Sequence, residues 1–359
     1  MRRAVRTRRQ TVADDSLRHR CQHGRMPFPV LRDLIAASSG LVFAVLSTAA
    51  SPSDPMAPIS LPAGIATHAA DGRRPIEALF ESYFSLVREG WILEVLTGSQ
   101  PAGTAAPLPI VTLRSPRRGA AVWILAGIHG EEPAGPNAIA DAIHEIAALG
   151  RERPVVLMPL LNPQGYARNW RYLNVPVYSE TVDGQSVGDS SHLLLSSEDP
   201  ARARAGAPTS AEAGAITAFI LRQIGDYPPA SSIDLHEDNL IDEGYVYSQG
   251  ALGAADPLAI EAVAVLKAEG VPIKMDGKTR FDEAIVGGII GPVVDSSIDE
   301  LMSSATILVN GRPTRGPAAA TVLVLETPAA ALPLTQRVRA HAALLRRLMA
   351  LMESTKPPT

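Results

Sequence analysis

The sequence contains a single cysteine, Cys21, among 359 residues. One cysteine cannot form an internal disulfide, and it also excludes the cysteine-rich zinc sites of the finger and ribbon type. Any bound metal ion must therefore take its ligands from histidine and carboxylate side chains. The lack of disulfides does not by itself decide the compartment in which the chain works.

The sequence also lacks an excess of positive charge. It has 33 Lys and Arg against 37 Asp and Glu, for a formal net charge of −4, and no basic cluster recurs beyond the first residues. This balance argues against a nucleic-acid-binding surface. Apolar residues make up 46% and charged residues 19%, which is the composition of a globular protein. The length suffices for one large α/β domain or two ordinary ones.

No apolar run is long and uninterrupted enough to predict a stable membrane span. The nearest candidate, LIAASSGLVFAVLSTAA at 34–50, resembles the hydrophobic region of a signal peptide, although its serines and glycine also fit a short anchor or a loosely packed helix. We interpret 1–50 as a basic leader with a candidate signal peptide, with Met26 as an alternative start, and 51–74 as a linker rich in Pro, Ala and Ser. The expectation is a periplasmic or secreted protein, and the alternative is a cytoplasmic one.

Strand and helix patterns alternate over 75–352, which we interpret as one catalytic domain. Apolar β-type runs occur at 92–96, 109–113, 121–126, 154–161, 231–235 and 319–325. Helical patterns occur at 75–87, 134–149, 210–224, 257–268 and 334–352. This alternation predicts an α/β fold with a mixed, mostly parallel twisted sheet and helices on both faces.

The continuous apolar run at 121–126 is followed by polar residues. Residues 121–132 read AVWILAGIHGEE, so that His129 and Glu132 follow a buried strand, at the edge where open α/β sheets bind ligands. Gly127 and Gly130 allow a sharp turn and a close approach to a ligand. A histidine and a carboxylate at this place can bind zinc if the fold supplies a third ligand. The alternative is a polar turn with a hydrogen-bonded histidine. His68 and Asp71 show the same spacing in the linker, and we assign that pair no role.

A second histidine also ends an apolar strand, in IDLHED. Alternate residues of a strand share a face, so Asp234 and His236 are predicted to point the same way. A carboxylate beside a metal-bound histidine fixes its tautomer and its orientation. Glu237 and Asp238 are rival ligands, but their side chains are expected to leave the strand in other directions. The alternative is a surface histidine next to a turn.

Two further positions carry charge where catalysis would need it. Glu326 follows the strand VLVL, and a carboxylate there could act as a general base toward metal-activated water, or form a structural salt bridge. Arg168 and Arg171 lie in ARNWRYLN, at the start of a long loop over 166–208. A guanidinium in this loop could stabilise negative charge on a substrate carbonyl, although a single loop arginine is more often a solvated charge.

At four places the sequence resembles the zinc carboxypeptidase superfamily, which includes deacylases of the succinylglutamate desuccinylase and aspartoacylase type. The matching segments are GIHGEE, NPQGYARNWR, DLHED and LETP, in the order of the family and spanning 127–328. The resemblance implies one zinc ion and attack of activated water on an amide carbonyl. It also implies a mixed sheet with helices on both sides.

Carried over residue by residue, the resemblance assigns the roles of five side chains. His129, Glu132 and His236 correspond to the zinc ligands, Glu326 to the general base, and Arg171 to the arginine that polarises the scissile carbonyl. The implied substrate is a small peptide or an N-acyl amino acid. We expect no nucleic-acid partner, and the oligomeric state stays open.

Two departures from the carboxypeptidase pattern bear on the substrate. The stretch in which carboxypeptidases carry adjacent Asn and Arg reads SVGDSSHLL at 186–194, with no arginine, although Asp189 is a candidate residue behind the zinc ligands. Arg202, Arg204 or Arg280 could grip an anion instead. Carboxypeptidases also have a substrate-contacting tyrosine well after the third zinc ligand, whereas here no tyrosine follows Tyr247. A metallocarboxypeptidase, an N-acyl amino acid deacylase and a non-catalytic zinc-binding module therefore all stay open as hypotheses.

Overall fold

The computed structural model describes residue 61 and the ranges 65–96, 108–173 and 210–354. The predicted leader, and with it the candidate signal peptide, lies outside the described residues, as do Asp189, Arg202 and Arg204. Within the described ranges, none of the helices combines the length and the apolar character that crossing a bilayer would require.

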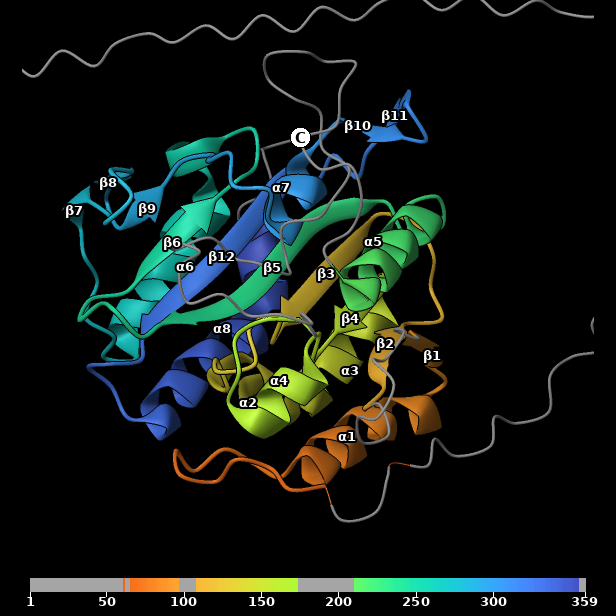
Figure 1. Ribbon diagram of the computed structural model, residues 1–359. Coiled ribbons are helices and arrows are strands. Elements are labelled where there is room, and N and C mark those ends of the chain that lie inside the picture. Colours follow the sequence, from red (N-terminus) through yellow and green to blue (C-terminus); the bar gives the residue numbers. More distant parts are fainter. Residues whose placement is uncertain (1–60, 62–64, 97–107, 174–209, 355–359) are drawn as a thin grey trace, which may run out of the picture. The chain divides into compact units, whose positions relative to one another are not determined.

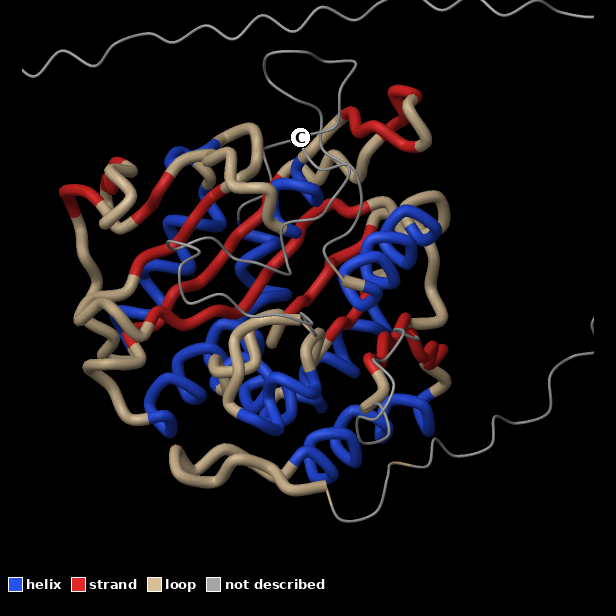
Figure 2. Tube along the Cα trace, in the orientation of Figure 1, coloured by secondary structure: helices blue, strands red, loops and turns tan. Residues whose placement is uncertain are grey.

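A ten-stranded sheet forms the centre of the domain, in the order β1-β2-β4-β3-β5-β12-β6-β9-β8-β7 (Figures 1 and 2). Its strands are β1 (Ile92–Leu96), β2 (Ile110–Arg114), β3 (Ala121–Ala126), β4 (Val155–Met158), β5 (Pro229–Asp238), β6 (Tyr245–Ser248), β7 (Asp276–Lys278), β8 (Ala284–Val286), β9 (Ile289–Ile290) and β12 (Thr321–Pro328). A separate hairpin is formed by β10 (Thr306–Val309) and β11 (Arg312–Arg315).

The middle of the sheet is parallel and its flanks are mixed. β4, β3, β5 and β12 are neighbours and run in one direction. β1 and β2 on one side and β6 on the other join antiparallel. The predicted mixed sheet with a parallel centre is confirmed. Because parallel neighbours end at the same edge of a sheet, the segments that follow β3, β5 and β12 lie side by side.

Helices cover both faces of the sheet, as predicted. They are α1 (Ile76–Phe84), α2 (Ala134–Asp141), α3 (Ile143–Glu152), α4 (Pro163–Arg168), α5 (Ala211–Gln223), α6 (Pro257–Ala268), α7 (Ile298–Ser303) and α8 (Leu334–Ser354), with short 3-10 turns at Ser85–Glu89 and Gly253–Ala255. α1, α2, α3, α6 and α8 pack on one face. α5 and α7 pack on the other.

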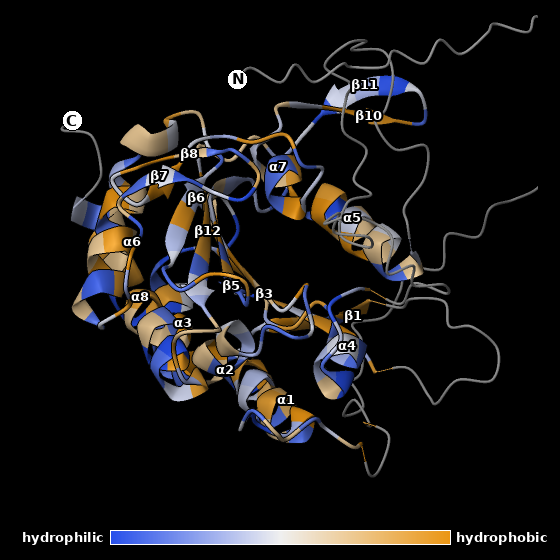
Figure 3. Cartoon of the chain, turned by 60° about the vertical axis from the view of Figure 1, so that its left-hand side comes forward, coloured by the Kyte–Doolittle hydropathy of each residue, from blue (hydrophilic) through white to orange (hydrophobic). Residues whose placement is uncertain are grey.

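Alternation along β3 shows how the two cores are divided. Val122 and Ile124 pack into the core beneath α2 and α8, whereas Trp123 and Leu125 pack into the core beneath α5. All six residues of β3 are buried, which is why its sequence reads as a continuous apolar run. Strand β3 is accordingly drawn as hydrophobic in Figure 3, while the helices alternate between hydrophobic and hydrophilic residues.

Several predicted elements differ in detail from those observed. The helix predicted over 134–149 is two helices, because Ala142 leaves the helical conformation at φ −105° and ψ 19°. The chain directly after the strand predicted at 154–161 begins α4, where the Asn162 side chain accepts a hydrogen bond from Gly165 N. β6 to β11 and α7 were not predicted, because two to six residues are too few to show a period.

The closing helix α8 has one arginine that faces inward, among others that face outward. Arg339, Arg346 and Arg347 are exposed, but Arg337 is buried and forms an ion pair with the buried Glu237 of β5. Burial lowers the pKa of Arg337 to about 10. The reason for the inward arginine is therefore the need to pair a carboxylate beneath the sheet.

His341 of α8 makes stability depend on pH. Its side chain is fully buried, with Nε2 at 3.1 Å from Thr327 Oγ1, and burial lowers its pKa to about 3, helped by Arg337. Between pH 6.5 and about 3, the unfolded chain binds a proton that the folded chain excludes, so folding stability falls as the pH falls.

We expect the replacement His341→Gln, which keeps a hydrogen-bonding group toward Thr327, to reduce this sensitivity to acid. From pH 7 to pH 5 the free energy of unfolding should fall by about 2 kcal/mol more in the unmodified protein than in the variant. Urea unfolding at both pH values measures the difference. The control is His144→Gln, a replacement of an exposed histidine on α3. The prediction would be contradicted if the unmodified protein and both variants lost the same free energy of unfolding between pH 7 and pH 5.

Candidate metal centre

Three buried metal-ligating side chains meet at the carboxyl edge of the central strands. His129 and Glu132 lie in the turn after β3, and His236 lies near the end of β5. The donor atoms of the three residues all lie within 4.8 Å of one another. His129 Nδ1 is 2.8 Å from Glu132 Oε1, and His236 Nδ1 is 3.0 Å from Glu132 Oε2. Residues 107 positions apart in the chain thus form one cluster around a single carboxylate.

The charges of this cluster depend on one another. Burial opposes the ionised form of Glu132, but His129 and His236 outweigh it and hold the pKa of Glu132 well below its usual range. Burial likewise opposes the charged form of His236, yet Asp234 and Glu132 raise its pKa well above normal. The backbone N–H of Glu237 also donates to Glu132 Oε2 at 3.1 Å. The site therefore keeps an ionised carboxylate at its centre.

The residues around His236 orient its ring. Asp234 shares the face of His236, as predicted, and its Oδ2 lies 3.3 Å from His236 Nε2, on the side opposite Glu132. Asp299 of α7 is a third buried residue with a donor atom within 4.8 Å of both. Glu237 points to the other face, where it accepts a hydrogen bond from Ala134 N and pairs with Arg337.

These donors fit a zinc ion. Two imidazoles and one carboxylate, none more than 6% exposed, form the three-ligand set that catalytic zinc sites use while leaving a position open. The His236 ring is held by a carboxylate on its far nitrogen, which leaves Nδ1 directed at the cluster.

Glu326 lies directly beside this cluster. It pairs in register with His236 across the parallel strands β12 and β5. Its Oε2 atom is buried without a hydrogen-bond partner among the described residues. Burial raises the pKa of Glu326 to about 7; Glu132 and Asp238 add to the rise, and His236 opposes it. A carboxylate in this state can exchange a proton near neutral pH.

The structure separates the two candidate arginines. Arg168 is exposed at the end of α4, whereas Arg171 Nη1 donates to Glu132 Oε1 at 2.7 Å and to Glu131 Oε1 at 3.1 Å. Burial raises the pKa of Glu131, and Arg171 opposes that rise. Of the two, only Arg171 contacts the metal-ligand cluster.

Gly130 brings the turn after β3 against the loop of Arg171. Its N–H donates to Arg171 O at 3.2 Å, and a Cβ atom at Gly130 would lie 2.1 Å from the carbonyl carbon of Gly165. The close approach that we predicted for Gly130 is therefore made to a neighbouring loop. Gly127 adopts φ +67°, as a sharp turn after β3 requires.

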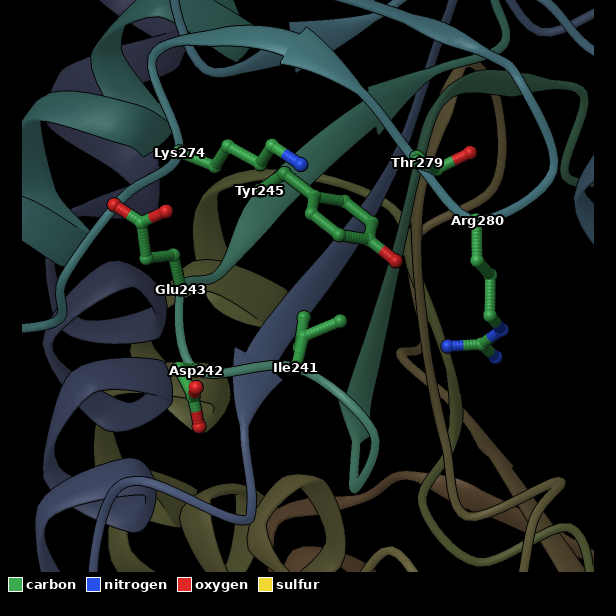
Figure 4. A pocket seen from close by; sticks show the side chains of 7 residues that line it. All are labelled: Ile241, Asp242, Glu243, Tyr245, Lys274, Thr279 and Arg280. Carbon is green, nitrogen blue, oxygen red and sulfur yellow. The ribbon is translucent and has the colours of Figure 1, made fainter. Parts of the chain in front are cut away.

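A cavity of about 220 Å³ lies next to Tyr245, the residue opposite Glu326 on antiparallel β6. Figure 4 shows Tyr245 between Lys274 and Arg280, with Asp242 and Glu243 on the Lys274 side. Asp238 Oδ2 accepts hydrogen bonds from the Tyr245 hydroxyl at 3.1 Å and from Arg280 Nη1 at 2.6 Å. Asp238 therefore bonds to two residues that line this cavity, and it is not one of the three converging metal-ligating residues.

Sequence reasoning missed Tyr245 and the contacts of Asp238. The alternation in Tyr-Val-Tyr was the available signal, because Tyr245 and Tyr247 share a face of a strand. It was too short to predict β6, and only the pairing of β6 with β12 brings Tyr245 to Glu326.

Comparisons with known proteins give one family match and several similar folds. The model of the succinylglutamate desuccinylase/aspartoacylase catalytic domain family matches residues 118–181, a segment that contains His129, Glu132 and Arg171. Among curated protein sequences, no match was found.

Solved structures share the fold at low sequence identity. A proposed metallopeptidase of Shewanella baltica OS155 has 22% identity and a TM-score of 0.59, over 78% of this chain and 92% of that one. One from Shewanella amazonensis SB2B has 22% identity and a TM-score of 0.60, over 79% and 94%. Carboxypeptidase A of Helicoverpa armigera has 13% identity and a TM-score of 0.51, over 79% and 74%. The predicted resemblance to the zinc carboxypeptidase superfamily, deacylases included, is confirmed, and the candidate metal site lies within that fold.

Proposed function

We propose that this chain is a zinc-dependent hydrolase that cleaves an amide bond. The observation that carries the proposal is the convergence of His129, Glu132 and His236 beside Glu326, whose Oε2 atom is buried without a partner among the described residues. A buried carboxylate oxygen without a hydrogen-bond partner is costly, and is expected where it serves a reaction. The fold of the metallopeptidases and the match to the deacylase family support the same class.

In the proposed mechanism the two imidazoles and Glu132 hold the zinc ion. When bound, zinc supplies a Lewis acid that makes water nucleophilic at neutral pH. Glu326 takes the proton of the attacking water, and can later deliver it to the leaving nitrogen of the amide. Its pKa, which burial raises to about 7, suits a group that must accept and then release a proton.

Arg171 is proposed to stabilise the carbonyl oxygen as negative charge develops there. Its guanidinium lies beside Glu132 with the side chain 30% exposed, so that it borders both the metal ligands and the space open to a substrate. A charged donor at this position acts where charge appears in the transition state.

The substrate side of the site favours no single class of amide. Of the arginines that could grip an anion, Arg280 is the described one, and Asp238 holds it at the cavity beside Tyr245. A peptide, an N-acyl amino acid or a peptidoglycan fragment each remains a proposed substrate. The alternative functions are a deacylase of the succinylglutamate desuccinylase and aspartoacylase type and a non-catalytic zinc-binding module.

Metal analysis of the purified protein, followed by assays on two substrate panels, tests this proposal. We expect one zinc per chain and turnover of either C-terminally unblocked peptides or N-acyl amino acids, and the panel that is hydrolysed decides between carboxypeptidase and deacylase. Stoichiometric zinc without turnover of any amide would favour the non-catalytic module. Absence of stoichiometric zinc would reject the whole scheme.

A further inference from the structure

Arg73 is a buried cation outside the predicted catalytic machinery. It stands three residues before α1, in the segment whose sequence reads as a linker, yet its side chain is 0% exposed. Arginine is rarely fully buried unless all of its charge is paired. The surroundings of Arg73 must therefore supply acceptors for a complete guanidinium.

All five N–H groups of the Arg73 guanidinium have acceptors. Nε and one N–H of Nη2 donate to the Asp71 carboxylate, at 2.9 Å and 2.5 Å. The two N–H groups of Nη1 are directed at Gly130 O, at 2.9 Å, and at Tyr166 O, at 2.6 Å. The second N–H of Nη2 reaches Asn169 Oδ1 at 2.5 Å. Only the planar fork of arginine provides donors in these directions, because a lysine has three donors on a single nitrogen.

The acceptors other than Asp71 belong to two segments of the proposed active site. Gly130 lies between His129 and Glu132 in the turn that carries two metal ligands. Tyr166 and Asn169 lie in α4 and at its C-terminal cap, where Asn169 adopts φ 56° and the chain turns toward Arg171. The guanidinium thus joins the metal-ligand turn to the segment that places Arg171.

At Gly130 the two segments touch through their backbones. Gly130 packs against Gly165 of α4 with no room for a side chain, and Gly130 N donates to Arg171 O. On the side of the metal ligands, the Arg171 guanidinium joins the segments by bonding to Glu131 and Glu132. Arg73 adds a second side-chain link between the same two segments through Gly130 O, Tyr166 O and Asn169 Oδ1. Asp71 in turn holds Arg73, and Arg73 lowers the pKa of Asp71 although burial opposes this.

We propose that Arg73 is a positioning residue, which fixes the turn carrying His129 and Glu132 relative to Arg171. The inference rests on the proposed function for its catalytic readout, but its metal-binding readout does not require any turnover. A displacement of about 1 Å at a reacting centre can cost about 10²-fold in rate. The loss of Arg73 should therefore lower kcat far more than it changes KM.

The test compares full-length Arg73→Met and Arg73→Lys with a matched control, Arg114→Met. Arg114 lies on β2, bonds to Gln223 and Glu94, and is remote from the metal ligands. With Co²⁺ as the probe, we measure its affinity and its visible absorption spectrum in each variant, together with kcat, KM and thermal unfolding. We expect Arg73→Met to lower kcat by about 10²-fold and to change the Co²⁺ spectrum, Arg73→Lys to recover part of both, and Arg114→Met to lose stability alone.

Asn169→Gly keeps the proposal testable if Arg73→Met fails to fold. Glycine adopts φ 56° without strain, so this change removes one acceptor and leaves the backbone intact. We expect a several-fold loss of kcat with little change in unfolding temperature. A Co²⁺ spectrum and affinity identical to those of the unmodified protein in both Arg73→Lys and Asn169→Gly would overturn the proposal. If the unmodified protein hydrolyses no amide, the proposed function fails, and the Co²⁺ measurements still decide the role of Arg73.

Discussion

Glu326→Gln is expected to lower kcat by about 10²–10⁴-fold while zinc stays bound, because the amide cannot accept the proton of the attacking water. The substitution keeps the size of the side chain, and Glu326 is not among the three converging metal ligands. Steady-state kinetics together with metal analysis separates the loss of the base from the loss of the metal. Turnover that survives this change would refute the proposed mechanism.

The same residue sets a pH dependence. With a pKa of about 7, which burial raises first and Glu132 and Asp238 raise further, Glu326 becomes protonated below neutrality and loses its basic form. The rate at low substrate should therefore fall on the acid side, and a bound cation would move that fall to lower pH because it favours the carboxylate. Any residual rate of the Glu326→Gln variant should not show this fall on the acid side of the pH profile. Glu94→Gln on β1 is the control with unchanged kinetics.

The residues at the ends of central strands were predictable from the sequence. His129, His236 and Glu326 each stand behind an apolar run, and parallel neighbours in a sheet bring such ends to one edge. The fold class followed from the alternation of strand and helix patterns. The order of the strands did not, because which apolar run pairs with which depends on packing between segments distant in sequence.

The residues that support the site could not be predicted in the same way. Asp71 and Arg73 lie in a segment that shows no hydrophobic periodicity. His68 and Asp71 have the same spacing as His129 and Glu132, but Asp71 pairs with Arg73 instead. Only the tertiary structure reveals that Arg73 is buried and that its acceptors come from Gly130 and Asn169. Local composition identifies such a segment as a linker because it is rich in Pro, Ala and Ser and shows no periodic apolar pattern.

The roles of glycine and of charge on α8 illustrate the same limit. The sequence indicated that Gly130 permits close approach, but not that Gly165 is its neighbour. It indicated an amphipathic closing helix, but not that Arg337 turns inward to meet Glu237. In both cases the partner lies more than 30 positions away in the sequence. The local periodic pattern of the segment therefore cannot identify it.

His236→Ala is expected to abolish stoichiometric zinc binding, because one histidine and one carboxylate remain of the three ligands. In the unmodified protein, zinc at 100 times its dissociation constant should raise the free energy of unfolding by about 2.7 kcal/mol, and in His236→Ala this gain should disappear. His144→Ala on the surface of α3 should retain all of it. Thermal unfolding with and without zinc, on protein first treated with a chelator, measures the effect.

Asp234→Asn provides the graded case between these two. Asp234 contacts the far nitrogen of the His236 ring and is not one of the three ligands of the cluster. Its replacement should therefore weaken zinc binding by about 10–100-fold without removing a ligand. The expected order of zinc affinity is therefore His144→Ala, then Asp234→Asn, then His236→Ala. An Asp234→Asn protein that binds zinc as weakly as His236→Ala would mean that Asp234 acts as a ligand itself, and equal affinity in all three would place the metal away from β5 altogether.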